Sequence, residues 1–201
     1  AYTTGGSWVV AGPVGITATG TTLNSPIGLT LLDANLDGFL DIATANTDTN
    51  SVSILPGDGE RGLVTPEESD LTQANTTAVA YADLNDDGIL DVVAISSNTA
   101  NAASRISVML GNADGTFQDA VDYAPDTSTT FSRLSSVIVA DVTGDGRADI
   151  IVTGRSTAGN DGVAILRNDI TTPTLQANSF VRGPSIRTGD APTSVVAGDF
   201  N

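Results

Sequence analysis

Short apolar runs separated by polar turns recur along the chain, and they predict strands rather than helices. In the first complete unit such runs cover residues 27–32, 41–45 and 52–55, with Gly, Asn, Asp and Pro between them. The runs are short and rich in β-branched residues, and none keeps an i, i+3, i+4 apolar spacing for three helical turns. The pattern therefore predicts an all-β chain.

These runs belong to a repeat with a period of 50 to 58 residues. The corresponding runs cover 78–82, 91–95 and 106–110 in the second unit, and 137–140, 149–153 and 163–166 in the third. A weaker fourth run lies near 63–64, 117–121 and 180–181. Four short antiparallel strands in each unit are typical of a β-propeller blade. The first run of each unit is rich in small residues, which suits the crowded innermost strand.

We therefore expect one all-β domain over residues 1–201, a partial or small β-propeller of four-stranded antiparallel blades. Its three complete repeats are expected at approximately 27–77, 78–134 and 135–192. Residues 1–26 and 193–201 are expected to supply end strands of adjoining blades, or of one blade that the two ends share. A β-sandwich or a solenoid with similar turns is the alternative, and the unit length and strand count favour the propeller.

A polar loop with the spacing D-x-[N/T]-x-D-G-x-x-D separates the first two strands of each unit. We name these loops loop one (33–41), loop two (83–91) and loop three (141–149), and a fourth copy begins at Asp199. Positions 1, 3, 5 and 9 carry side-chain oxygens, position 7 can offer its backbone carbonyl, and glycine at position 6 permits a tight turn. Calcium takes six to eight such hard oxygen ligands. The loops therefore predict about three calcium sites.

The expected calcium ligands share these five positions in each loop. They are Asp33, Asn35, Asp37, the carbonyl of Phe39 and Asp41 in loop one; Asp83, Asn85, Asp87, the carbonyl of Ile89 and Asp91 in loop two; and Asp141, Thr143, Asp145, the carbonyl of Arg147 and Asp149 in loop three. Loop three is expected to bind most weakly, because Thr143 is neutral and Arg147 adds a positive charge.

Other interpretations of the loops agree less well with the sequence. An EF-hand needs a glutamate at position 12 and flanking helices, and dockerin-type loops also end on an acid there. Position 12 is Thr44, Ala94 or Val152. Ordinary Asp/Asn/Gly turns are the remaining alternative. Without a cation, however, each close pair of carboxylates would repel by about 1–4 kcal/mol, in all three copies.

Charge and composition exclude several classes of function. The chain has 24 acidic and 8 basic residues, all of the latter Arg, and its net charge of −16 disfavours nucleic acid and anionic membranes. It has no Cys and no His, which excludes disulfides, thiol catalysis, the usual zinc sites and His-based triads. The three glutamates, Glu60, Glu67 and Glu68, lie in one polar stretch. We therefore expect no enzymatic activity, no nucleic-acid partner and no membrane insertion.

The three complete loops resemble those of the FG-GAP repeat family in its bacterial VCBS-like form, with Thr143 as the one departure. Residues 111–117 (GNADGTF) are similar to the G-N-x-D-G-T-F turn of the family; residues 57–59 are a partial version, and the region of Asn168 and Asp169 has lost it. The resemblance covers roughly residues 27–201. It implies an extracellular calcium-binding propeller module with a structural or adhesive role, calcium making each blade rigid, and a protein or glycan partner at the cell surface or matrix, or self-assembly.

Two alternatives remain open within this resemblance: a calcium-dependent, lectin-like propeller, and an accessory domain of a secreted enzyme. Sugar sites usually include an aromatic ring, and aromatic residues make up only 4% of the chain. Trp8, Tyr2, Tyr81 and Tyr123 do not recur at matching positions of the units. The sequence therefore favours the structural or adhesive role.

Overall fold

The computed structural model describes residues 25–57, 59, 67–70, 75–97, 104–125, 131–156, 159 and 161–199, with residues 67–70 described in their backbone alone. The described part of the chain is all β, without a helix. It accordingly contains no helix that is long and apolar enough to span a membrane. The strands expected in residues 1–26 lie outside the described residues, apart from the start of the first strand.

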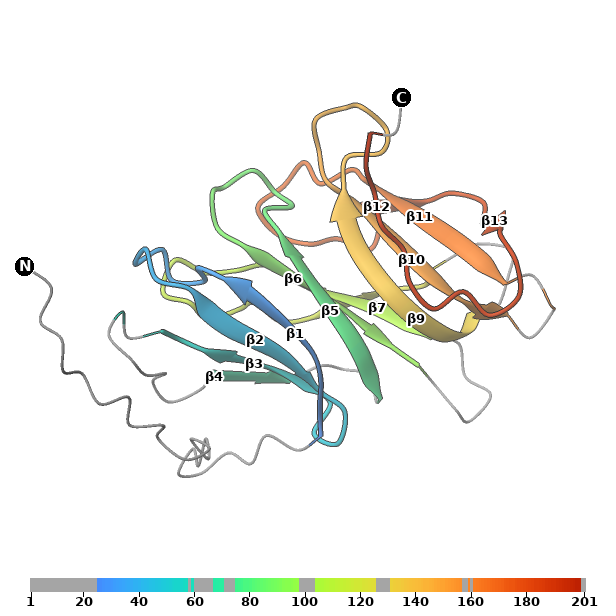
Figure 1. The fold of residues 1–201 in the computed structure, drawn as a ribbon. Coiled ribbons are helices and arrows are strands. Elements are labelled where there is room, and N and C mark those ends of the chain that lie inside the picture. Colours follow the sequence, from blue (N-terminus) through green and yellow to red (C-terminus); the bar gives the residue numbers. More distant parts are fainter. Residues whose placement is uncertain are drawn as a thin grey trace, which may run out of the picture.

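Thirteen antiparallel strands form three sheets in the described ranges, each sheet made by one sequence unit (Figure 1). Sheet one contains β1 (Pro26–Leu32), β2 (Asp41–Asn46), β3 (Ser51–Leu55) and β4 (Glu67–Asp70) in that order. Sheet two contains β5 (Thr76–Ala82), β6 (Asp91–Ser96), β7 (Arg105–Met109) and β8 (Val121–Tyr123). Sheet three contains β9 (Phe131–Ala140), β10 (Asp149–Ser156), β11 (Gly162–Asn168) and β12 (Phe180–Arg182), with β13 (Ile186–Arg187) also paired to β11.

The three sheets lie side by side, with their first strands next to one another. β1 contacts β5, and β5 contacts β9 (Figure 1). Gly28, at a bulge in β1 with a φ of 79°, faces β5 closely: a Cβ placed there would lie 3.7 Å from the Cα of Ala78. Gly28 and Ala78 thus lie where the first strands of sheets one and two converge.

Two apolar clusters fill the spaces between the sheets. Alternate side chains of β6 enter different clusters, because successive side chains of a strand point to opposite faces. Val92 and Ala94 join Leu32, Val52 and Ile54 between sheets one and two, whereas Val93 and Ile95 join Phe131, Ile150, Val152 and Leu166 between sheets two and three. The middle sheet is therefore buried on both faces, which explains its nearly continuous apolar runs.

The predicted order of four strands in a unit is confirmed, and the fourth strand expected near 180–181 is formed as β12, whereas the one expected near 117–121 is displaced. The strand expected near 117–121 begins only at Val121, because residues 111–117 close a turn through a bridge between Gly111 and Phe117. In sheet one the fourth strand is Glu67–Asp70, and the expected run at 63–64 lies outside the described residues. A closed ring of sheets is not seen among the described residues.

Residues 191–199 follow the path of a further first strand without forming one. Ala191 has a φ of 53°, like Ser25 (54°) and Asn75 (61°), and all three stand eight residues before the first aspartate of a loop. The Ser135 hydroxyl donates to the carbonyl of Pro192 at 2.6 Å, as Thr77 donates to that of Leu134 at 3.4 Å. The strand expected over 193–201 is therefore not formed in residues 193–199, although the segment enters in the manner of β5.

Candidate metal-binding loops

The three loops lie at the same end of their sheets and share one backbone conformation (Figure 1). Position 6 is Gly38, Gly88 or Gly146, with φ values of 87°, 84° and 87°, as the predicted tight turn requires. Position 4 is also left-handed, with φ values of 58° at Leu36, 59° at Asp86 and 77° at Gly144. Two left-handed residues separated by one other thus curl every loop around its polar side chains.

Positions 1, 3 and 5 converge on the interior of the loop. In loop one the N–H of Asp37 donates to both Asp33 Oδ1 and Asn35 Oδ1 at 3.1 Å, so the two oxygens surround one nitrogen. Gly38 donates to Asp33 Oδ2 at 3.0 Å, and Phe39 donates to Asp37 Oδ1 at 2.8 Å. Loop two repeats this pattern through its equivalents Asp83, Asn85, Asp87, Gly88 and Ile89.

The aspartates at position 9 are buried and held by backbone amides. Asp41, Asp91 and Asp149 are fully buried, whereas position 5 is exposed in each loop. Asp91 accepts the N–H of Leu84 on Oδ2 and that of Gly111 on Oδ1, both at 2.8 Å. Asp41 does the same with Ala34 and Gly57 at 2.8 Å. These aspartates therefore fasten each loop to the end of the third strand of its sheet.

The oxygens present are nevertheless those that calcium prefers. Each of loops one and two combines carboxylates at positions 1, 5 and 9 with an amide oxygen at position 3, and a carboxylate oxygen that accepts one amide keeps a second lone pair. No three acidic side chains in the described residues lie close enough together to enclose a metal as they stand. The side chains at positions 1, 3 and 5 lie close together, whereas the buried position-9 carboxylate is oriented chiefly by backbone amides. The chemistry of this donor set fits calcium.

The repeat and its loops match one known family of sequences. The FG-GAP-like repeat profile matches residues 33–94 and 83–152, two overlapping stretches that each begin at the first aspartate of a loop. The chain belongs to the FG-GAP-like repeat family. Such repeats typically form extracellular, β-propeller-like modules of adhesion proteins. No curated protein matches the chain in sequence.

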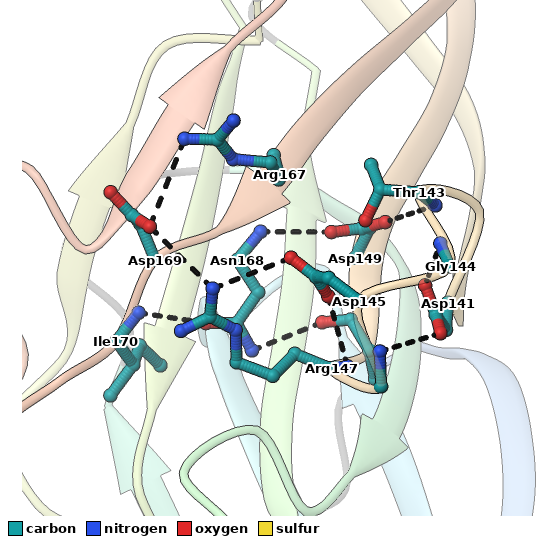
Figure 2. A network of polar contacts seen from close by, with 12 residues as sticks. Asp141, Thr143, Gly144, Asp145, Arg147, Asp149, Arg167, Asn168, Asp169 and Ile170 are labelled. Carbon is teal, nitrogen blue, oxygen red and sulfur yellow. Dashed lines mark hydrogen bonds and ion pairs between the residues drawn. The ribbon is translucent and has the colours of Figure 1, made fainter.

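The third loop of these FG-GAP-like repeats differs from the other two. Arg147 Nη2 lies 3.3 Å from Asp145 Oδ2 and 3.7 Å from Asp169 Oδ1, and Arg167 lies 3.8 Å from Asp169 (Figure 2). A guanidinium thus contacts the position-5 carboxylate of this loop. Residues 131–192 also hold six Arg and six Asp, so that the net charge of −16 comes from the rest of the chain. Loop three therefore carries less net negative charge than loops one and two.

Hydrogen bonds and burial move the pKa values of the loop carboxyls in opposite directions. The amides of Gly146 and Gly144 lower the pKa of Asp141, and the amide of Arg147 lowers that of Asp145. Burial raises the pKa of Asp91 to about 6, against the opposing effect of the Gly111 and Leu84 amides, and the nearby Asp87 and Asp83 charges raise it further. Loop two of the FG-GAP-like fold therefore holds a carboxyl that resists ionisation.

The stability of the calcium-free protein should consequently fall as the pH rises from about 4 to about 6. Asp91 keeps its proton to a higher pH in the folded than in the unfolded chain, so the folded state binds more protons in this interval. Two pKa units of difference correspond to roughly 3 kcal/mol. Melting temperatures of decalcified protein over this range, for wild type and D91N, provide the measurement. A slope that persists unchanged in D91N would show that other groups cause it.

Proposed function

We propose that this chain is an extracellular calcium-binding β-propeller module with a structural or adhesive role at a cell surface or matrix, in which calcium makes each blade rigid. The observation that carries the proposal is the threefold recurrence of one loop: left-handed backbone at positions 4 and 6 curls each loop around its position-1 and position-5 carboxylates, which accept the same backbone amides in all three copies. Without a bound cation, the carboxylates of each of the three loops would repel one another, which is unfavourable for a simple turn.

Membership of the FG-GAP-like family supports the propeller and its extracellular location. The side-by-side sheets, each with four antiparallel strands in sequence order and its first strand next to the neighbouring first strand, agree with blades around an axis. We propose a protein or glycan partner at the cell surface, or self-association, rather than nucleic acid or membrane insertion, because the net charge is −16. We further propose that the module is not an enzyme.

Burial of the two described tyrosines favours the structural or adhesive role over a lectin-like one. Tyr123 is only 4% exposed and packs edge-to-face on Phe180 with ring centroids 5.1 Å apart, so it offers no face to a sugar. The hydroxyl of Tyr81 is buried, and Tyr81 packs against the cluster between sheets one and two. Trp8 and Tyr2 lie outside the described residues. A glycan array probed in calcium would detect the lectin-like alternative directly.

Calcium should raise the melting temperature of the decalcified protein by roughly 5–10 °C for each site that fills. A site at a hundredfold excess of calcium over its dissociation constant contributes about 2.7 kcal/mol, and 1 kcal/mol is worth about 2–4 °C in a domain of this size. The measurement is a calcium titration followed by calorimetry, with magnesium as the comparison cation.

Matched variants assign the effect to the loops. D37N, D87N and D145N each remove one position-5 charge, and the new amide oxygen can still accept the N–H that Phe39, Ile89 or Arg147 donates. Each variant should lose part of the calcium-induced rise, and the triple variant most of it. D119N removes an exposed charge outside the loops and should lose none. A wild-type protein whose melting temperature is indifferent to calcium would refute the proposed role of the metal.

A further inference from the structure

A single buried asparagine joins the loops of two neighbouring sheets. Asn168, the last residue of β11, is fully buried, and its Nδ2 donates to the carbonyl of Leu84 in loop two at 2.7 Å and to that of Ala148 in loop three at 3.1 Å. Its Oδ1 accepts the N–H of Ile170 at 2.9 Å (Figure 2). Both the amide nitrogen and the amide oxygen of the side chain are therefore engaged, and the side chain is fixed in place.

The contacts of Asn168 complete a continuous path between the position-9 aspartates of loops two and three. The backbone N–H of Asn168 donates to Asp149 Oδ1 at 2.9 Å, while its side chain holds the carbonyl of Leu84. The N–H of Leu84 donates to Asp91 Oδ2 at 2.8 Å. One residue on each side of the sheet boundary thus connects Asp91 to Asp149, with all of these groups buried.

The boundary between sheets one and two is built differently. The residues equivalent to Asn168 are Gly57 and Gly111, because their N–H groups donate to Asp41 and Asp91 at 2.8 Å. A Cβ at Gly111 would lie 2.4 Å from the carbonyl oxygen of Leu90, a backbone clash. Glycine has no side chain to reach the preceding loop, so the first boundary has no counterpart of the Asn168 amide.

Sheet two instead approaches loop one through a packing contact. A Cβ at Gly115, in the turn of residues 111–117, would lie 3.4 Å from the Cβ of Asn35. A side chain at this position would be in ordinary van der Waals contact with Asn35, so the turn lies close to loop one, and this approach carries no directional bond. The two boundaries therefore differ in kind: hydrogen-bonded between loops two and three, and packed between loop one and sheet two.

We propose that Asn168 is a positioning residue that couples loop two to loop three, so that occupation of either by calcium raises the affinity of the other, while loop one binds independently. The inference rests on the proposed function for its calcium part. Ordering of Asp149 holds the backbone of Asn168, the Asn168 amide holds the carbonyl of Leu84, and the N–H of the same leucine orients Asp91. A loop whose partner is already ordered loses less conformational freedom on binding, which is positive cooperativity.

The glycine amides at position 6 allow the loops to be followed separately. Gly38, Gly88 and Gly146 each donate to the position-1 aspartate of their own loop, at 3.0, 2.8 and 2.9 Å. Calcium titrations by amide NMR of the whole chain therefore report three affinities. D145N should weaken loop two about 5–10-fold in the wild-type background and leave it unchanged in an N168A background, a coupling within the usual range. Loop one should not respond in either background.

Two further variants serve as controls for this comparison of D145N with and without the Asn168 side chain. N168G introduces the residue that sheets one and two already carry at this position, and it should abolish the coupling as N168A does. N112A removes an asparagine whose Nδ2 bonds Thr116 within its own turn, and it should preserve the coupling. An equal effect of D145N on loop two with and without the Asn168 side chain would overturn the proposal, as would coupling that extends to loop one.

Hydrogen exchange in decalcified protein tests the link without any metal. The Leu84 amide should exchange about tenfold faster in N168A and N168G, whereas the Ala34 amide, its equivalent in loop one, should keep its rate. Failure of the wild-type loops to bind calcium, together with this selective change at Leu84, would refute the proposed function and leave the structural link standing. Exchange at Leu84 that is insensitive to both variants would refute the link itself.

Discussion

Replacing Asp91 with alanine should lower the free energy of unfolding by about 2–6 kcal/mol, even in the absence of calcium. Both carboxylate oxygens accept backbone amides, from Leu84 and Gly111, and the side chain is fully buried. Alanine leaves these two amides without an acceptor, and each buried unsatisfied group costs about 1–3 kcal/mol. Urea unfolding of decalcified protein, followed by circular dichroism, measures the change without a contribution from the metal.

Two substitutions in the same loop separate this structural role from the loss of charge. D86N removes an exposed charge at position 4, where asparagine tolerates the φ of 59°, and should change stability little. D91N keeps one acceptor oxygen and should cost less than D91A. If D91A and D86N had equal effects, the buried bonds of Asp91 would not support the loop. If D91A were harmless without calcium and harmful with it, position 9 would act as a ligand alone.

The order of the strands and the position of the loops could be predicted because each depends on local sequence. Alternating apolar residues determine the faces of a strand, and the Asp, Asn and Gly pattern determines where the chain turns. Glycine at position 6 predicts a left-handed φ. Leu36 and Asp86 at position 4 do not predict theirs, because the loop imposes that conformation on ordinary residues. The fourth strands of sheets one and two are harder to locate from the sequence, because their pairing follows the register of β3 and β7 rather than their own composition.

The roles of position 9 and of Asn168 depend on contacts between distant residues. Asp91 begins a strand, and its place in a regular D-x-N-x-D spacing suggests a ligand; only the fold shows that Gly111, twenty residues later, brings an amide to it. Asn168 stands where the G-N-x-D-G-T-F turn is lost in the third unit. In the sequence, this departure indicates only a degenerate repeat. In the fold, the Asn168 side chain donates a hydrogen bond to the carbonyl of Leu84, 84 residues earlier.

Truncation of Phe131 to alanine should cost about 3–5 kcal/mol, the usual range for a phenylalanine removed from a packed core. Phe131 is fully buried at the start of β9, among the side chains that join sheet two to sheet three, including Leu134 and Ile106. Its carbonyl accepts the N–H of Ser104 at 2.9 Å, a bond that alanine keeps, so the loss reports packing alone. Urea unfolding gives the magnitude, and V181A, at a side chain 42% exposed on β12, is the control.

The same substitution tests whether the sheets unfold as one unit. Sheets two and three share the cluster that Phe131 fills, whereas sheet one meets sheet two through a separate cluster. Native-state hydrogen exchange in F131A should therefore show faster exchange in β6, β7 and β10 and little change in β2 and β3, because a cavity weakens first the elements that line it. Uniform acceleration in all three sheets would mean that the cooperativity extends through both clusters. A loss confined to β9 would mean that the cluster does not hold the sheets together.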